Sequence, residues 1–424
     1  MRYAIVPKSF FSILFLVLFY KVLLDIGYIY ISAKDYLYMG TYKNLNVEKL
    51  IFAYTSIIVL TILLTYNHSH ISDFFKQLLF IIVFVPYSTV FSLKNQSTLY
   101  FLTAFLCFIL IILSSKLFHK IRIRNLKEGK NFWFIFILLF SAISYLILIS
   151  NLGLKFNLSF ENVYDIRFSY KEELKYSGEM IDYIINWQGN VINPFLFGFF
   201  IVKKKYRYAW IILGLQLLLF SYTGYKSVFF AVFAIYVVLM LQRRNSFLNF
   251  TLIFSILTML AISIYFIFRN QWIFFLFAQR LLILPAQISF QYFEFFSMHD
   301  LVKLSHSIFS SFFEYPYKVA PAFLIGELYY NNSAANANTS FLADAYMNFG
   351  IAGMLIYSIF LSFIFYFIDC ISLKKNKTLI TVLLFVPIFS LSNAGLLTTI
   401  NTHGLGLAIL IAYLMPVELD KESR

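Results

Sequence analysis

Apolar stretches long enough to cross a lipid bilayer recur along almost the whole chain. Polar breaks separate segments of 12 to 23 residues, most of them within the roughly 17 to 25 residues that a helix needs to cross the hydrocarbon core. Of the 424 residues, 61% are hydrophobic and only 13% are charged, which is more apolar surface than a soluble core can bury. The sequence therefore predicts an all-α polytopic membrane protein that forms a single integral membrane domain over residues 1–424.

The polar breaks divide the chain into about twelve expected transmembrane helices. The sixth segment is short and polar at its start, so its true beginning is expected nearer Ile181. The expected spans are 10–31, 50–66, 74–92, 98–114, 132–150, 191–202, 208–221, 227–241, 249–268, 346–368, 378–397 and 404–416.

Lys and Arg concentrate in the short segments on one side of the expected membrane. "KLFHKIRIRNLKEGK" at 116–130, "KKKYR" at 203–207 and "KKNK" at 374–377 all fall on the side that holds Met1. Because cytoplasmic loops carry the excess of Lys and Arg, both termini are expected in the cytoplasm. The net charge of +14 is then a signal of topology, so nucleic acid is not an expected partner, whereas membrane lipids are.

Two segments on the opposite side are long, namely 151–190 and 269–345. Loops much longer than about 12 residues are usually functional or disordered, and these two are too aromatic for disorder. The second contains the apolar run "WIFFLFAQRLLIL" at 272–284, which holds Arg280 and ends before Pro285. A run of this length favours a helix that lies on the membrane or re-enters it. A full crossing there would also move "KKNK" to the outer side.

Metal and nucleotide sites have no support in the sequence. Cys107 lies in an expected span and Cys370 at a cytoplasmic end, so the two cannot pair. His68 and His70 have no companion ligands, and the chain has neither a P-loop nor a GxGxxG motif. We therefore expect no metal and no cofactor.

Three short motifs accompany this topology. In "NVYDIRFSYKEELKYSG", Arg167 is followed after ten residues by Gly178; "SYTGYKS" is a Gly-basic turn between two spans; "NTSFLADAYMNFGIAGM" leads from the long outer segment into a span. With two long outer loops and cytoplasmic termini, the chain resembles the Wzy-type O-antigen polymerases, which are bacterial oligosaccharide repeat-unit polymerases. The related O-antigen ligases carry a His followed ten residues later by Gly, and neither His299 nor His306 is so placed.

The resemblance implies a fold similar to that of the C-type membrane glycosyltransferases and a location in the bacterial inner membrane. It also implies an enzyme of lipopolysaccharide biosynthesis that acts at the periplasmic face. Such a glycosyltransferase moves the growing glycan from undecaprenyl pyrophosphate onto an undecaprenyl pyrophosphate-linked repeat unit. These lipid-linked oligosaccharides are the implied substrates, and a chain-length regulator is an implied partner.

The lipid pyrophosphate leaving group needs cations as its negative charge develops. Arginine suits this role because its planar fork binds phosphate oxygens in a bidentate way and stays protonated. Arg167, Lys226, Arg269 and Arg280 are the candidates. Each has an ordinary alternative, because Arg167 could pair with an acid of its own loop, Lys226 could reach the interface as many lysines do, and Arg269 could anchor the end of a span.

A glycosyl transfer also needs a base that takes the proton of the acceptor hydroxyl. Asp344 in "LADAY" and Glu327 in "IGELYY" are the preferred candidates, with Glu161 and Asp165 behind them. Asn338 is a candidate for binding sugar hydroxyls. A lone acid can equally cap a helix or pair with a cation, and an Asn can cap a helix, so the alternatives stay open.

Lys21 and Asp25 lie four residues apart in the first expected span, on one face of a helix, and are expected to neutralise one another.

Two other classes of function also remain. A lipid-linked oligosaccharide flippase has a similar length but is expected to have short outer loops and a charged central cavity. An O-antigen ligase shares the donor and the chemistry. A secondary transporter is less expected, because it would more readily show a repeated pair of interrupted helices, and the sequence shows no such repeat.

Overall fold

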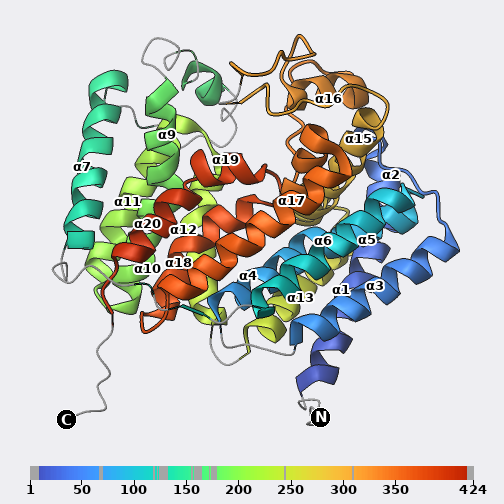
Figure 1. Cartoon of the computed structure of the whole chain (residues 1–424), viewed down its shortest axis with the longest axis horizontal. Coiled ribbons are helices and arrows are strands. Elements are labelled where there is room, and N and C mark those ends of the chain that lie inside the picture. The colour runs from blue at the N-terminus through green and yellow to red at the C-terminus, as the bar shows by residue number, and fades with distance from the viewer. Residues whose placement is uncertain are drawn as a thin grey trace. The chain divides into compact units, whose positions relative to one another are not determined.

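The computed structural model describes residues 9–65, 70–117, 120, 121, 123, 132–153, 156, 165–170, 172, 179–242, 245–307 and 310–417. Within these ranges the chain forms helices and no strands (Figure 1). Seven of the described helices are long and apolar enough to cross a membrane, and four more are apolar but shorter. The predicted all-α membrane fold is thus confirmed, while the number of twelve crossings stays a prediction. The seven are Phe10–Asp35, Val47–Leu64, Ile71–Leu93, Phe132–Asn151, Ser246–Phe268, Trp272–Phe296 and Phe341–Ile371.

The chain divides into two compact units that interleave along the sequence. The first unit comprises Met1–His119, Asn245–Tyr366 and Leu391–Leu396. The second comprises Lys120–Arg244, Phe367–Ser390 and Leu397–Arg424.

Helix α1 (Ser9–Gly27) belongs to the first unit and keeps an exposed face that includes Phe11 and Phe15. It packs along α13 (Ser246–Phe268) and also contacts α3 (Val47–Thr65) and α5 (Val85–Leu93). A π-helical segment, η1 (Tyr28–Ser32), and a short helix, α2 (Ala33–Asp35), extend α1, and the 3₁₀ turn η2 (Leu37–Met39) follows. The other helices of this unit are α4 (Ile71–Leu79), α6 (Thr98–Leu117), α14 (Trp272–Phe274), α15 (Leu284–Phe296), α16 (Pro321–Tyr330) and most of α17 (Phe341–Ile371).

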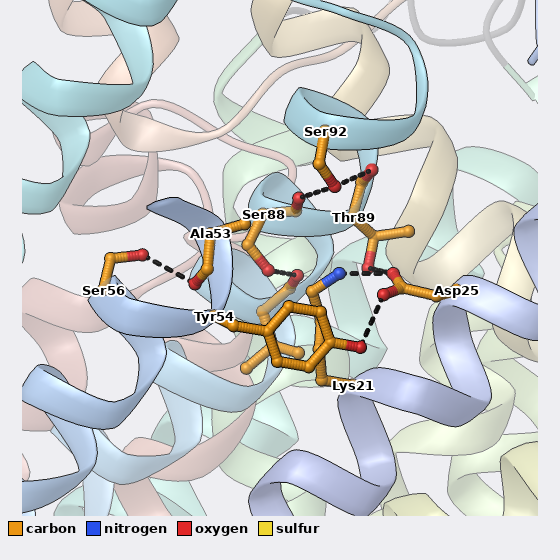
Figure 2. Close-up of polar contacts among 9 residues, drawn as sticks. Lys21, Asp25, Ala53, Tyr54, Ser56, Ser88, Thr89 and Ser92 are labelled. Atoms are coloured by element: carbon orange, nitrogen blue, oxygen red, sulfur yellow. Dashed lines mark hydrogen bonds and ion pairs between the residues drawn. The ribbon is translucent and has the colours of Figure 1, made fainter. Parts of the chain in front are cut away.

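A buried ion pair ties three of these helices together (Figure 2). The ammonium of Lys21 donates to the carboxylate of Asp25, which also accepts the hydroxyl of Tyr54 on α3 at 2.9 Å and that of Thr89 on α5 at 2.9 Å. Lys21 and Asp25 are both buried. The predicted mutual neutralisation of Lys21 and Asp25 is confirmed, and the hydroxyl donors satisfy the carboxylate further.

The second unit is a bundle around α10 (Asn193–Val202), which contacts α11 (Tyr206–Thr223), α12 (Lys226–Leu241) and α18 (Lys377–Ser390). Helix α9 (Glu179–Trp187) runs through η4 (Gln188–Ile192) directly into α10. A continuous helix therefore begins close to Ile181, as expected of the sixth segment, while its crossing of the membrane stays a prediction. The remaining helices of this unit are α7 (Phe132–Leu152), α19 (Leu396–Asn401), of which all but Leu396 belong here, and α20 (Leu405–Leu414).

Prolines within three apolar helices each follow a π-helical segment. A proline inside a regular α-helix loses one hydrogen bond and clashes with the carbonyl four residues earlier. A π-helical turn widens the helix at that place, which relieves the clash and lets the helix continue. The pairs are η3 (Phe80–Phe84) with Pro86, η4 with Pro194, and η5 (Phe275–Ile283) with Pro285.

The apolar run at 272–284 consequently does not end before Pro285, because helix continues from Trp272 to Phe296. Both halves of this helix contact the same end of the first helix. Just before its start the carbonyl of Gln271 accepts the hydroxyl of Tyr36 at 3.3 Å, and in its second half Gln287 Nε2 donates to the carbonyl of Met39 at 2.6 Å. Its length is sufficient for a crossing, so the predicted interfacial or re-entrant placement stays a prediction.

Candidate functional site

Asp344 lies in the first turn of α17, on a short helical piece that is set off from the rest of that helix. The break falls at Phe349 and at Gly350, whose φ of +63° is a backbone conformation that glycine adopts without strain. The amide of Phe341 donates to the carbonyl of Leu391 at 3.1 Å, which fixes this piece to the loop after α18. Asp344 is therefore positioned by two segments distant in sequence.

The carboxylate of Asp344 rests directly against the backbone of Gly395 in that loop. A Cβ atom added to Gly395 would lie 2.4 Å from Asp344 Oδ2, so no side chain fits there without displacing the carboxylate. Two tyrosines, Tyr292 on α15 and Tyr357 on α17, lie close enough to interact electrostatically with Asp344. Asp344, Gly395, Tyr292 and Tyr357 are called the Asp344 cluster below.

The two tyrosines of the Asp344 cluster differ in how their hydroxyls are used. Tyr292 donates to the carbonyl of Ala337 at 3.1 Å, just before α17. The hydroxyl of Tyr357 is buried and makes no hydrogen bond to any described residue. A buried hydroxyl without a partner in the described part of the chain, near a half-buried carboxylate, gives the cluster a second group that can form a hydrogen bond with a bound molecule.

Buried hydroxyls also fix the segment that leads into α17. Tyr87 on α5 donates to Ser289 Oγ at 2.7 Å and is hydrogen-bonded to Ser340 as well. Ser289 in turn is 3.1 Å from Thr339 Oγ1. These contacts hold residues 339 and 340 against α5 and α15, so they set where Asp344 begins its turn of helix.

Arg167 lies in the second unit, on a helical segment at 165–170. Tyr170 anchors this segment, because its ring is buried among Leu148, Ile185 and their neighbours and its hydroxyl donates to Asp182 at 3.2 Å. The guanidinium of Arg167 donates through Nη2 to the carbonyl of Gly224 at 3.1 Å. Arg167 is thus attached to the turn between α11 and α12.

The same turn carries Lys226. The guanidinium carbon of Arg167 lies 5.2 Å from the centre of the Tyr225 ring, and Lys226 is the next residue. Burial and the charge of Asp182 raise the pKa of Tyr225 to about 12, against a smaller opposing effect of Arg167, so this tyrosine stays neutral. The structure therefore brings together two of the four predicted phosphate-binding cations, Arg167 and Lys226, at the turn between α11 and α12.

The other predicted residues are held less firmly. Arg269 ends α13 with a φ of +53°, Arg280 lies in η5, Glu327 lies in α16, and Asn338 precedes α17. All four side chains are exposed, as is that of Asp165. Of the two preferred bases, Asp344 is enclosed by other groups, whereas Glu327 faces outward. Glu161 and Gly178 lie outside the described residues.

Sequence reasoning missed Tyr292, Tyr357 and Gly395. Tyr292 and Tyr357 are two of 31 tyrosines in an aromatic chain, so neither stands out. Gly395 in "LSNAGLL" interrupts an apolar stretch, which is a signal for close backbone approach, but its partner is more than 50 positions earlier. Comparison of the chain with family models, curated proteins and solved structures found no match. The function is therefore argued from the geometry.

Proposed function

We propose that the chain is an O-antigen polymerase, a membrane glycosyltransferase that extends a lipid-linked surface polysaccharide. The observation that carries this proposal is the Asp344 cluster, a half-buried carboxylate that packs against a glycine backbone, with two tyrosines near enough to interact with it electrostatically. A carboxylate fixed in this way is suited to accept a proton from a sugar hydroxyl, which a freely moving surface acid does less well.

The proposed reaction exchanges one glycosidic oxygen for another. The bond between the anomeric carbon of the growing glycan and the undecaprenyl pyrophosphate oxygen breaks, and its electrons leave with the pyrophosphate. A hydroxyl oxygen of the acceptor repeat unit forms the new bond to the same carbon. Its proton passes to the carboxylate of Asp344 and from there to water. No metal or cofactor takes part in this scheme.

Arg167 and Lys226 are proposed to bind the donor pyrophosphate, and Arg280 and Arg269 to serve the same substrates at the membrane surface. Two cations on one turn concentrate positive charge where phosphate oxygens can be bound. Stabilising the charge that develops on a leaving group is often the largest single contribution to catalysis. Because Tyr225 is neutral, it does not compete with phosphate for the guanidinium of Arg167 as a carboxylate would.

We infer the outer face of the bacterial inner membrane as the location, with both termini cytoplasmic and about twelve crossings. The basic segments on one side of the chain support this orientation. The contacts of Gln271 and Gln287 with the same end of the first helix support a re-entrant or interfacial helix at 272–296. An open outer loop region of this kind is expected of the C-type membrane glycosyltransferase fold.

Deletion of the gene followed by gel analysis of surface glycan tests the proposal. A polymerase predicts that the ladder of chain lengths collapses to a single repeat unit, which is still attached and displayed. Complete loss of surface glycan would instead indicate the flippase or the ligase. An unchanged ladder would refute all three.

A further inference from the structure

A second polar group lies on α15, one to two turns before Tyr292. The side chain of Gln287 is fully buried, and its Nε2 donates to the carbonyl of Met39 at 2.6 Å. Its Oε1 is buried too and makes no hydrogen bond with any described residue. A buried amide oxygen without a donor is costly to the fold, so a ligand hydroxyl is a natural partner for it.

Gly40 lies directly beside this amide. Its φ of +70° places it in the left-handed region, and a Cβ atom there would lie 3.5 Å from Gln287 Nε2 and 4.0 Å from Gln291 Nε2. Gln291 is one helical turn after Gln287 and accepts the hydroxyl of Tyr330 at 2.9 Å. Gln287, Gln291 and Tyr330 are called the amide cluster below.

The amide cluster is electrically neutral. Burial raises the pKa of Tyr330 to about 12, although its hydrogen bonds with Gln291 and Gln287 oppose the shift, so its hydroxyl keeps its proton. Two amides and one phenol offer both donors and acceptors without net charge. This combination suits sugar hydroxyls, which donate and accept, and suits phosphate poorly.

A rim of aromatic and charged groups borders the cluster. Glu294, one turn further along α15, is exposed and within hydrogen-bonding range of the Tyr329 hydroxyl. The ammonium of Lys94 lies 4.9 Å from the centre of the Tyr42 ring, and burial lowers the pKa of this lysine to about 8, against the opposing charge of Glu294. Tyr42 is exposed, so one face of a sugar can stack on its ring.

Tyr292 connects this group to Asp344. It interacts electrostatically with both Tyr330 and Asp344, so the amide cluster and the Asp344 cluster adjoin within the first unit. A sugar bound by the amides would place a neighbouring ring of the same oligosaccharide toward the carboxylate.

We propose that the amide cluster is a sugar-binding subsite that takes one uncharged pyranose ring of the acceptor oligosaccharide. In this subsite Gln287 Oε1 accepts a sugar hydroxyl, Gln291 Nε2 donates to a sugar oxygen, and Tyr42 covers the ring. The identification of the sugar as the acceptor's rests on the proposed polymerase function. The subsite makes no covalent bond and acts only through orientation and affinity.

Binding is measured on the full-length protein in lipid nanodiscs. The probe is the single repeat-unit oligosaccharide, released by mild acid from the lipid of the strain that lacks this gene. The wild-type protein should bind it, and Gln287→Leu should weaken binding at least tenfold. The matched control is Gln279→Leu, which removes another fully buried glutamine of the same helix that accepts from Ser32. Gln279→Leu should bind as the wild type does.

Tyr42→Ala provides a variant that cannot be dismissed as misfolded, because this side chain is exposed. It should weaken binding several-fold, with Tyr206→Ala, an exposed tyrosine at the start of α11, as its unaffected control. Equal binding by wild type and both subsite variants overturns the subsite, as does a wild-type protein that binds no oligosaccharide. Asp344→Asn should lose polymer but keep binding. The two proposals can fail separately. If the variants bind as expected but deletion of the gene leaves the glycan ladder intact, the sugar-binding subsite stands and the polymerase function is refuted.

Discussion

At the scale of single residues, the contact between Gly395 and Asp344 allows a test of whether the position of the Asp344 carboxylate matters for polymer formation. Gly395→Ala puts a methyl group 2.4 Å from Asp344 Oδ2, so the carboxylate must shift. Positioning of reacting groups is sensitive to displacements of about 1 Å. We expect Gly395→Ala to reduce polymer formation at least tenfold and Asp344→Asn to reduce it by a factor of about 10² to 10⁴, as for loss of a general base.

Chain length of surface glycan at equal protein level is the measurement for these variants. Gly214→Ala is the matched control, because a Cβ atom at Gly214 in α11 meets nothing within 4 Å. Gly214→Ala should leave the ladder as it is. Normal polymer from Gly395→Ala or from Asp344→Asn would remove Asp344 from the mechanism.

Arg167 carries the second prediction at this scale. A lysine keeps the charge of Arg167 but lacks the planar fork, so Arg167→Lys and Arg167→Ala should both shorten the glycan. The expected loss is on the order of 2–4 kcal/mol of transition-state stabilisation, roughly 30-fold to several hundred-fold in rate. Lys318→Ala, at an exposed cation, should have no effect. Full activity of Arg167→Lys, with Arg167→Ala merely unstable, would show that the residue only anchors the turn at Gly224.

Residue chemistry alone predicted part of the site. Asp344 and Glu327 are equivalent in sequence terms, since each is a lone acid near an expected span. Only the fold distinguishes them, because Asp344 in α17 lies against Gly395 whereas Glu327 in α16 is exposed. Arg167 and Lys226 were predicted separately, and their meeting at one turn depends on the burial of Tyr170, which spacing does not reveal.

At the scale of elements, apolar periodicity predicted the helices well, but a proline led to a wrong prediction of where one helix ends. The run at 272–284 was expected to end before Pro285, yet helix extends to Phe296 because η5 widens the turn before the proline. The same arrangement occurs at Pro86 and Pro194. The hydrogen-bond pattern of a π-helical turn is a property of the backbone, so apolar spacing gave no sign of it.

The buried ion pair gives a prediction about the first helix. Asp25→Leu leaves the ammonium of Lys21 buried and without its carboxylate, which typically costs about 3–5 kcal/mol of stability. The thermal midpoint of the protein in detergent should therefore fall well below that of the wild type. The double variant Lys21→Met with Asp25→Leu should recover much of the loss, because no charge remains buried. A single variant that melts with the wild type would show that the pair does not stabilise the bundle.

At the scale of the whole molecule, charge distribution predicts an orientation that the helices alone do not give. Helix lengths identify seven candidate spans in the described part of the chain, whereas Lys and Arg in the short loops indicate which ends face the cytoplasm. The division into two units was not foreseen, because each unit is assembled from segments far apart in the sequence. Hydropathy is a property of neighbouring residues, so it does not indicate which distant segments pack together.

The orientation is tested with reporter fusions at Glu173 and Ser333, one in each long outer segment. Both positions should report the periplasm, and fusions after Lys204 and Lys377 should report the cytoplasm. A cytoplasmic signal at Glu173 or Ser333 would place the Arg167 turn or the Asp344 cluster on the wrong side for a lipid-linked glycan displayed at the outer face.

The most direct test of the central claim uses the purified protein in liposomes. Undecaprenyl pyrophosphate-linked single repeat units from the deletion strain are supplied as both donor and acceptor, without nucleotide sugar. The wild-type protein should convert them into a ladder of longer glycans, the Gly214→Ala protein should do the same, and the Asp344→Asn protein should leave them as single units. Single units that stay unchanged with the wild-type protein, or a ladder made equally well by Asp344→Asn, would contradict the account.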